Sequence, residues 1–460
     1  MMRYTMMLFS FLVSFNCLSQ EQQLIAASQA GASAVFFDVA APSVPLVQPG
    51  AFKDAGECEV RGGLPSFFAK ARSGKPLRIA YLGGSITRSN LMYRLQSAKF
   101  IHGMFTAVEI KGINAGISGT DADLGACRLQ EQVLQYQPDL LFIEFAVNGG
   151  FVKGVEGIIR QTKKYNKNID ICLIYTVTSR QLKEYEQGQI PLGIQKLDSI
   201  AQHYSLPSIH MAKEAASLWK AGKLIDTGDP AKVTGQLVFS QDGVHPLPPG
   251  GDLYAAAIAR SLLKIQTAKP VKTESLPAPL HADNWEDARM LSPLEIAKFS
   301  EGWRKEDTDA AGFKSYKEWF PYLMVADKPG DAFSFTFRGS MFGFFDIGGP
   351  EAGQLDILVD GKSVKLTRKG TNLYKIVEGS GDQLNRFNPF CNNRYRGQFI
   401  CIELPEGLHQ VTFKISEEIP DKRKILGQNQ LEDITLHPDK YNRSVIYLGK
   451  ILIRGVYAVK

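Results

Sequence analysis

The chain has 460 residues, which at about 150 residues per domain predicts two or three domains. Hydrophobic residues make up 44% of it and charged residues 22%, a balance that excludes a disordered or collagen-like chain. Lysine and arginine total 53 against 47 acidic residues, and this mild excess without a basic block argues against a nucleic-acid-binding protein.

Residues 1–19 have the pattern of a secretory signal peptide. One arginine precedes a mostly apolar run at residues 8–15, and Ser19 offers a small residue for cleavage. The run is too short to span a bilayer, and no later run reaches about 18 uninterrupted apolar residues. Cys17 leaves a lipid anchor open, although the two residues before it are poor ones for lipidation. We therefore expect an exported protein, periplasmic or secreted, without stable membrane insertion.

The five cysteines that follow this leader do not form a metal-binding pattern. Cys391 and Cys401 flank a short predicted hairpin and could form a disulfide, whereas Cys127 and Cys172 lie in apolar patterns typical of buried thiols. The sequence has no C-x-x-C pair, no H-E-x-x-H motif and no cysteine–histidine cluster, and its seven histidines are scattered. We expect no metal and no other cofactor.

Residues 63–266 are predicted to form an α/β domain, because short apolar runs alternate there with stretches that carry apolar residues at helical spacing. The predicted strands are residues 77–82, 108–113, 139–145, 169–176 and 207–210, and the predicted helices include residues 121–136, 194–203 and 250–263. This alternation favours a parallel sheet with helices on both faces. In such sheets ligands bind beyond the carboxyl ends of the strands.

The chain changes character at residues 267–284, a polar stretch with several prolines that is predicted to be a linker. Residues 285–460 contain short strand patterns, and Asp360-Gly361 is typical of a hairpin turn, so this part predicts an all-β sandwich. The predicted strands are residues 332–338, 341–347, 354–359, 362–366, 398–404, 409–415 and 444–456. The lead segment, residues 20–62, contains one candidate strand at residues 34–40 that could pack on the C-terminal domain.

Two motifs could supply a nucleophile and its base. The sequence Gly-Gly-Ser-Ile-Thr after the first predicted strand would expose Ser85 on a sharp strand-to-helix turn. Asp242 lies three residues before His245 on a predicted loop, where its carboxylate could orient the imidazole. Each motif alone is also compatible with an ordinary turn or helix cap.

Two further motifs could supply hydrogen-bond donors. Gly119 follows the second predicted strand, where a residue without a side chain lets a backbone amide approach a substrate closely. Asn148 follows the third, and its amide could donate to an anionic oxygen. An ordinary turn or cap explains either residue equally well when it is considered alone.

In chain order, the motifs GGSIT, ISGTD, AVNGG and DGVHP resemble the four blocks of the SGNH/GDSL hydrolase family over about residues 64–265. Gly-Gly-Ser in place of the usual Gly-Asp-Ser resembles an exported bacterial branch. The resemblance implies a flavodoxin-like three-layer sandwich and metal-free ester hydrolysis. The matching residues are Ser85, Asp242 and His245 for the catalytic triad and Ser85, Gly119 and Asn148 for the oxyanion hole. Gly149 stands where the family often has aspartate, which leaves the detail of the pocket open.

An exported chain with this resemblance and an appended β-sandwich is similar to bacterial esterases that remove acetyl groups from polysaccharides. The candidate sugar-stacking residues are Trp285, Trp303, Trp319 and Tyr322. Arg88, Ser89 and Asn90 follow the nucleophile motif, could bond sugar hydroxyls and offer little apolar surface to a long acyl chain. We expect the sandwich, which lies beyond the matching residues, to affect polymer affinity more than small-ester chemistry.

Two alternatives stay open at this point. A lipase or thioesterase of the same fold would act on other esters, and the lack of a long apolar lid weakly disfavours it. A non-catalytic glycan-binding protein could retain the fold, but the intact set of Ser85, Asn148, Asp242 and His245 argues against a decayed enzyme. The expected partner is an acylated carbohydrate or another small ester.

Overall fold

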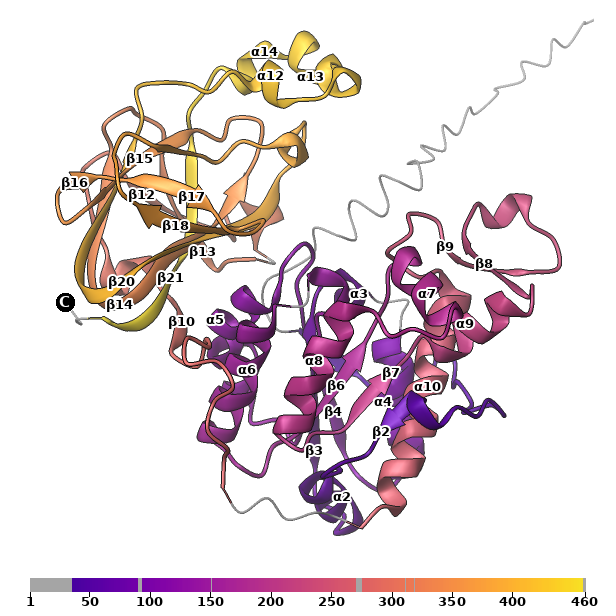
Figure 1. Cartoon of the computed structure of the whole chain (residues 1–460). Coiled ribbons are helices and arrows are strands. Elements are labelled where there is room, and N and C mark those ends of the chain that lie inside the picture. The colour runs from indigo at the N-terminus through magenta and orange to yellow at the C-terminus, as the bar shows by residue number, and fades with distance from the viewer. Residues whose placement is uncertain are drawn as a thin grey trace, which may run out of the picture.

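The computed structural model describes residues 35–89, 93–149, 151–269, 275–310, 312–317 and 319–457. The predicted signal peptide and Cys17 lie outside these residues, so export and lipid anchoring stay predictions. Two domains follow one another along the chain, an α/β domain and an all-β domain (Figure 1). Among the described helices, none is both long and apolar enough to cross a membrane.

The α/β domain is built on a sheet of seven strands within the described residues, in the order β1-β4-β3-β5-β6-β7-β2. Its strands are β1 (Val35–Asp38), β2 (Cys58–Glu59), β3 (Leu77–Gly83), β4 (Ile110–Gly116), β5 (Leu140–Glu144), β6 (Asp170–Tyr175) and β7 (Ser208–His210). The five central strands are parallel and correspond to the five predicted ones. Their apolar runs are buried because helices cover both faces of the sheet.

The two outer strands come from the lead segment, which corrects one expectation. β1 pairs antiparallel with β4, with Val35 opposite Asn114, so the candidate strand at residues 34–40 joins the α/β sheet and not the C-terminal domain. β2 pairs antiparallel with β7 at the other edge. The physical reason is that each edge of a parallel sheet exposes unpaired backbone groups, which a short extended segment can satisfy.

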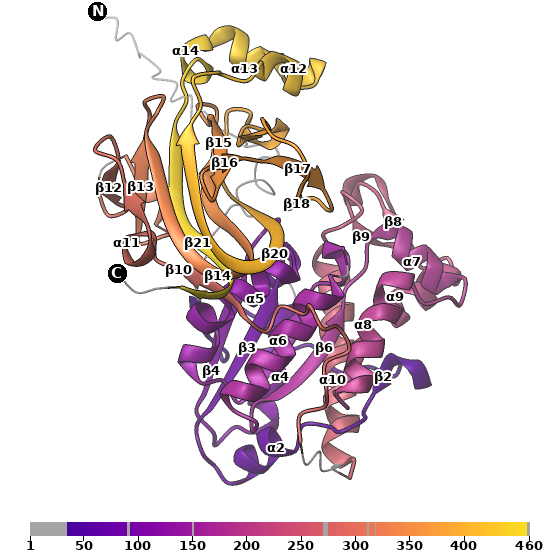
Figure 2. The same ribbon diagram turned by 60° about the vertical axis from the view of Figure 1, so that its left-hand side comes forward.

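The helices pack in two layers around this sheet (Figure 2). One layer contains α5 (Ala122–Gln132), α6 (Val152–Tyr165) and α8 (Leu192–His203), and the other contains α4 (Tyr93–Met104) and α10 (Pro248–Thr267). The remaining helices are α2 (Pro65–Arg72), α3 (Ser85–Arg88), α7 (Ser179–Glu186) and α9 (Lys213–Lys220). A short parallel pair, β8 (Leu224–Thr227) and β9 (Leu237–Ser240), leads into the loop that carries Asp242 and His245.

The C-terminal domain is a continuous, strongly curled sheet with twelve described strands, and the predicted all-β class is confirmed. They are β10 (Ala288–Leu291), β11 (Lys298–Phe299), β12 (Arg304–Asp307), β13 (Tyr322–Ala326), β14 (Ala332–Gly348), β15 (Gln354–Val359), β16 (Lys362–Ser363), β17 (Lys365–Arg368), β18 (Leu373–Val377), β19 (Gln383–Asn385), β20 (Arg396–Ile415) and β21 (Ile446–Tyr457). β14 and β20 each merge two predicted strands into one long bent strand. The Asp360-Gly361 turn joins β15 to β16 with φ angles of 51° and 76°.

Short helices close one end of this domain and bury part of its loops. They are α12 (Lys422–Ile425), α13 (Leu431–Leu436) and α14 (Pro438–Tyr441), whereas α11 (Pro293–Ile296) lies away from this end and packs against β21. Cys391 packs in the small apolar cluster beneath α12–α14, whereas Cys401 lies on β20 in the main core. Both are buried free thiols, so the disulfide considered from the sequence does not form; the two cysteines belong to separate clusters and do not flank a hairpin.

One hydrophobic cluster spans the two domains, and the all-β domain has a further core of its own. Buried residues of β5 and α5 belong to the same cluster as Trp285, Phe345 and Phe399 of the all-β side. The backbone of Trp285 lies so close to α6 that a Cβ on Gly157 would sit 2.5 Å from its carbonyl carbon. Lys450 on β21 pairs with Glu131 on α5 at 2.8 Å. The interface is therefore packed like a domain interior.

Candidate active site

The structure brings the three predicted triad residues together at the carboxyl end of the sheet. Ser85 Oγ lies 2.7 Å from His245 Nε2, and His245 Nδ1 lies 2.6 Å from Asp242 Oδ2. An ionised carboxylate only accepts hydrogen bonds, so the proton of a neutral His245 resides on Nδ1. Nε2 then accepts the hydrogen bond from the Ser85 hydroxyl, which is the arrangement that a general base requires.

Asp242 is held in its ionised form by its own loop. Its Oδ1 accepts hydrogen bonds from the backbone amides of His245 at 2.8 Å and Val244 at 2.9 Å, and from Ser240 Oγ at 3.1 Å. Burial by itself would raise the pKa of Asp242, but the hydrogen bonds from the His245 ring and these amides outweigh it and hold the pKa below its usual range. The carboxylate therefore stays charged beside the imidazole.

The turn that carries Ser85 depends on close contact with Asn148. Gly84 precedes Ser85, and a Cβ at Gly84 would lie 2.6 Å from Asn148 Oδ1 and 2.9 Å from Nδ2. The Asn148 amide therefore occupies the space that a side chain at residue 84 would fill. Asn148 Oδ1 is buried without a hydrogen-bond partner among the described residues. The Asn148 side-chain amide thus lies beside the Ser85 turn, with its Oδ1 acceptor unpaired within the described chain and its Nδ2 group as the possible donor.

Gly119 lies at the same edge, just before α5. Its φ of +70° belongs to the left-handed region that favours glycine. A Cβ there would sit 2.7 Å from Nη2 of Arg396, which reaches over from the all-β domain. Asp121 caps α5 by accepting hydrogen bonds from the amides of Asp123 at 3.1 Å and Leu124 at 3.2 Å. The loop around Gly119 is thus fixed from both domains.

A buried carboxyl group behind Ser85 was not among the predicted site residues. Glu144, the last residue of β5, is fully buried and accepts hydrogen bonds from Thr87 Oγ1 at 2.8 Å and from Thr176 Oγ1. Burial raises its pKa although these hydrogen bonds oppose the shift. Thr87 belongs to α3, so Glu144 ties the helix that begins at Ser85 to the sheet. Its only sequence signal is an acidic residue ending an apolar strand.

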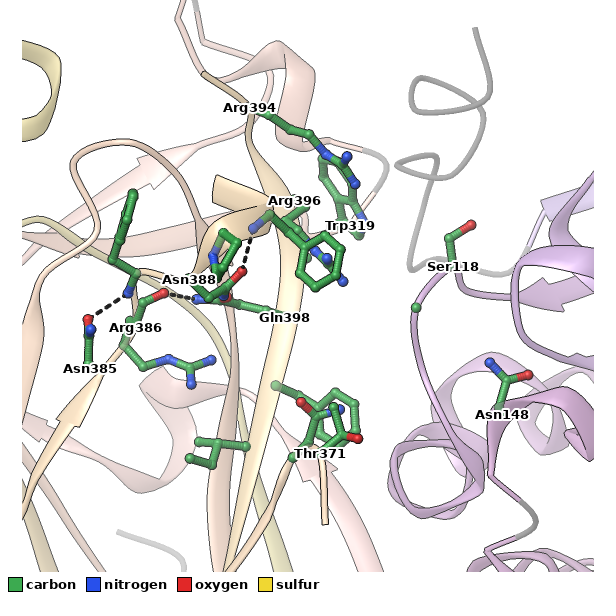
Figure 3. A pocket seen from close by; sticks show the side chains of 18 of the residues that line it. Ser118, Asn148, Trp319, Thr371, Asn385, Arg386, Asn388, Arg394, Arg396 and Gln398 are labelled. Atoms are coloured by element: carbon green, nitrogen blue, oxygen red, sulfur yellow. Dashed lines mark hydrogen bonds between the residues drawn. The ribbon is translucent and has the colours of Figure 1, made fainter. Parts of the chain in front are cut away.

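A pocket of 680 Å³ opens over Ser85, and its far wall belongs to the all-β domain. Figure 3 shows this wall facing Ser118 and Asn148 across an open space. The wall residues with the largest polar or aromatic side chains include Trp319, Arg386, Asn388, Arg394, Arg396 and Gln398. The all-β domain thus lines the pocket that contains Ser85 and His245. Whether it affects polymer affinity more than small-ester chemistry stays a prediction.

The predicted sugar-binding residues are distributed unevenly around this pocket. All three tryptophans are buried, and of them only Trp319 is among the described residues that line the pocket. Tyr322 bonds Ser292. Arg88 and Ser89 are not among the lining residues, and Asn90 lies outside the described residues. No metal-binding group of three or more histidine, cysteine or acidic side chains occurs within the described parts of the chain.

Solved structures share this two-domain architecture. A two-domain esterase active on acetylated mannans, co-crystallised with mannopentaose, is 22% identical, with 87% of this chain and 97% of that chain covered and a TM-score of 0.63. A second structure of an esterase with the same description is 21% identical over 87% of this chain and 98% of that chain, with a TM-score of 0.61. The chain has this two-domain fold. The predicted α/β domain with a parallel sheet, followed by an all-β domain, is thereby confirmed. No protein-family model and no curated protein matches the chain.

Proposed function

We propose that this protein is a serine esterase that removes short acyl groups, acetyl above all, from carbohydrate. The observation that carries the proposal is the continuous relay from Ser85 through His245 to Asp242, with distances of 2.7 and 2.6 Å. Such a relay makes a hydroxyl nucleophilic at neutral pH. A purely glycan-binding protein has no use for it.

In the proposed reaction His245 Nε2 takes the proton of Ser85 as Oγ attacks the ester carbonyl. The new C–O bond leaves a tetrahedral intermediate with a negative oxygen. The backbone amides of Ser85 and Gly119 and the side-chain amide of Asn148 would donate hydrogen bonds to this oxygen. Each such donor typically contributes about 2.7–4 kcal/mol to transition-state stabilisation.

The intermediate then expels the sugar hydroxyl, which takes its proton from His245. The acyl group stays on Ser85 as an ester. A water molecule that loses its proton to His245 attacks this ester, and a second tetrahedral intermediate releases the carboxylic acid and restores the serine. Asp242 stays ionised throughout and stabilises the imidazolium of both steps.

Three features support a carbohydrate substrate over a lipid. The pocket is large and lined mostly by polar side chains, with arginines and asparagines in its far wall. Trp319, with 8% of its surface exposed, is an aromatic residue of the pocket lining that a sugar ring could contact. The mannan-active esterase with the same fold acts on acetylated polysaccharide. A long acyl chain would gain about 0.8 kcal/mol per buried CH₂ only on an apolar surface.

The test is hydrolysis of p-nitrophenyl esters and release of acetate from acetylated polysaccharides by the full chain. We expect p-nitrophenyl acetate to be cleaved faster than the butyrate, and the octanoate to be cleaved negligibly. Ser85→Ala and His245→Ala should each lower kcat at least 1,000-fold, while the midpoint of thermal unfolding stays near that of the wild type.

Two results would contradict the proposal. Retention of most of the activity by Ser85→Ala would show that this residue is not the nucleophile. Faster cleavage of the octanoate than of the acetate would favour a lipase. Ser199→Ala, which changes a serine on α8 whose hydroxyl bonds only its own helix at Gln195, serves as the matched control.

A further inference from the structure

The formally charged side chains that line the described part of the pocket are all positive. Arg368, Arg386, Arg394 and Arg396 line it, and its described lining contains no aspartate or glutamate. The formal charge of the whole chain is only +6 over 460 residues, so the concentration of guanidinium groups here is local. A cleft lined by one sign of charge attracts ligands of the opposite sign.

Two of these arginines already have hydrogen-bond acceptors within the protein for their guanidinium groups. Arg386 forms a buried two-pronged ion pair with Asp346, at 2.6 and 3.0 Å. Arg368 donates to the carbonyl oxygens of Gly370 and Thr371 in its own loop. Neither guanidinium is therefore the first choice for a ligand anion.

Arg394 and Arg396 differ from these two. Neither forms an ion pair with a carboxylate among the described residues, and Arg394 Nε is buried without a hydrogen-bond partner there. The Arg396 guanidinium lies 4.9 Å from the centre of the Phe390 ring, which holds it in place without neutralising it. Two neighbouring guanidinium groups are thus held beside the pocket with their charge uncompensated.

Such an arrangement costs free energy in the empty protein. Burial lowers the pKa of both arginines, and the charge of Arg396 lowers the pKa of Arg394 further. A chain that only needed to bind neutral hydroxyl groups could use asparagine or glutamine at these positions without that cost. An anion placed between the two side chains would remove the repulsion and complete their hydrogen bonds.

We propose that the pocket binds an anionic glycan, with Arg394 and Arg396 as the ligands of a carboxylate or sulfate group on the sugar. The inference rests on the proposed esterase function and names the class of its substrate. A Cβ on Gly119 would lie 2.7 Å from Nη2 of Arg396, so this guanidinium lies beside the loop of Gly119. The anionic group therefore lies on the sugar unit that carries the ester or on the next one. A planar carboxylate and a tetrahedral sulfate can each accept hydrogen bonds from a pair of guanidinium groups.

The test is calorimetric titration of the full-length protein with ester-free tetrasaccharides that undergo no turnover. The probes are a galacturonate tetramer, the same tetramer with its carboxyl groups reduced to alcohols, and a sulfated galactan tetramer. We expect at least one anionic tetramer to bind ten-fold or more tightly than the neutral one, with an affinity that falls as salt rises. The affinities for the galacturonate tetramer and the sulfated galactan tetramer show whether the anionic group of the substrate is a carboxylate or a sulfate.

Arg394→Gln and Arg396→Gln should bring the anionic tetramers to within three-fold of the neutral one. Arg394→Lys should retain part of the preference for the anionic tetramers, because lysine keeps the positive charge but lacks the planar guanidinium that donates two parallel hydrogen bonds. Arg338→Gln removes an equal charge from an exposed position on β14 and should keep the ten-fold preference. Thermal unfolding of each variant verifies that it is folded.

Equal affinity for all three tetramers, binding of none of them, or equal behaviour of Arg394→Gln and Arg338→Gln would each overturn the inference. Hydrolysis of p-nitrophenyl acetate separates this failure from that of the proposed function. If hydrolysis depends on Ser85 but the anionic tetramers bind no more tightly than the neutral one, this inference is overturned and the proposed function stands. If Ser85-dependent hydrolysis is absent, the proposed function fails whatever the titrations show. Loss of kcat on the neutral ester in Arg396→Gln alone, without anion preference, assigns Arg396 to the oxyanion and also overturns the inference.

Discussion

At the scale of single residues, the proposed reaction depends on the orientation of one imidazole, that of His245. Asp242 fixes the His245 ring through Nδ1 and is itself fixed by two backbone amides of its loop. The hydrogen bonds lower its pKa, so the stability that they contribute is complete above the usual aspartate pKa of about 4. That stability is lost only as the pH falls through the lower value of the folded state. Asp242 therefore remains a carboxylate at every pH where the protein is expected to work.

Asp242→Asn should lower kcat for p-nitrophenyl acetate by about 10²–10⁴-fold, because an amide can favour the wrong imidazole tautomer. The measurement is kcat and KM between pH 5 and 9. Asp309→Asn, a change at an exposed aspartate of the all-β domain, is the control. A variant that keeps more than a tenth of the wild-type kcat would show that Asp242 does not orient the base.

Gly84→Ala should disable the oxyanion site without touching the triad. The added Cβ would come within 2.6 Å of Asn148 Oδ1 and displace that side chain. We expect kcat to fall by about 10²–10³-fold, the loss typical of one missing oxyanion donor, and Asn148→Ala to match it. In the double variant the two losses should not add, since both remove the same donor.

Gly103→Ala is the matched control for this glycine change. Gly103 lies in α4, where an added Cβ would meet nothing within 4 Å. This variant should keep full activity and gain slightly in helix stability. Full activity of Gly84→Ala would remove Asn148 from the oxyanion site.

At the scale of elements, the N-terminus of α5 combines a helix cap with an electrostatic cost. Burial raises the pKa of Asp121 to about 6 although it accepts hydrogen bonds from two amides. Burial raises the pKa of Asp123 as well, and the charges of Asp121 and Glu403 raise it further. A negative charge near a helix N-terminus contributes only about 0.3–1 kcal/mol, which the cost of burying an unpaired charge exceeds.

Asp123→Asn should therefore raise the midpoint of thermal unfolding at pH 8. A carboxyl group whose pKa is raised in the folded state binds its proton more tightly there than in the unfolded state. Its contribution to stability falls as the pH rises from about 4 through the raised pKa, and asparagine removes this loss. Calorimetry at pH 5 and pH 8 measures the difference. A lower midpoint at pH 8 in the variant would contradict the assignment.

Elements that depend on local sequence patterns could be predicted from the sequence, whereas those that depend on a distant partner could not. The central strands and the Ser85 turn depend on local patterns, and their positions follow from apolar runs that end in glycine or polar residues. The candidate strand at residues 34–40, which could have packed on the C-terminal domain, pairs with β4 of the α/β sheet, because the sequence of an edge strand does not specify its partner. The sequence does not predict that Arg394 and Arg396 line the site, because Arg396 reaches it only through the pairing of β20 with β14, where it lies opposite Gly348. Its distance from Ser85 along the chain leaves no local signal.

At the scale of the whole molecule, one hydrophobic cluster and one pocket are each built from residues of both domains. Side chains from the all-β side, including Trp285, Phe345 and Phe399, are buried in the cluster that also contains α5. Fully exposing an aromatic or aliphatic side chain of this size costs about 1.5–3 kcal/mol. Separation of the domains would expose several of them, which is comparable to the whole stability of a typical domain. The protein is therefore expected to behave as one cooperative unit.

Calorimetric unfolding of the full chain should accordingly show a single transition, in contrast to the separate transitions of loosely tethered domains. A chain ending at residue 267 should unfold at a lower temperature or aggregate. Where it stays folded, it should hydrolyse p-nitrophenyl acetate more slowly than the full chain, because the wall that confines the ester and contacts the loop of Gly119 is missing. Two well-separated transitions, together with full small-ester activity in the shortened chain, would show that the all-β domain is an independent module and that the triad works without it.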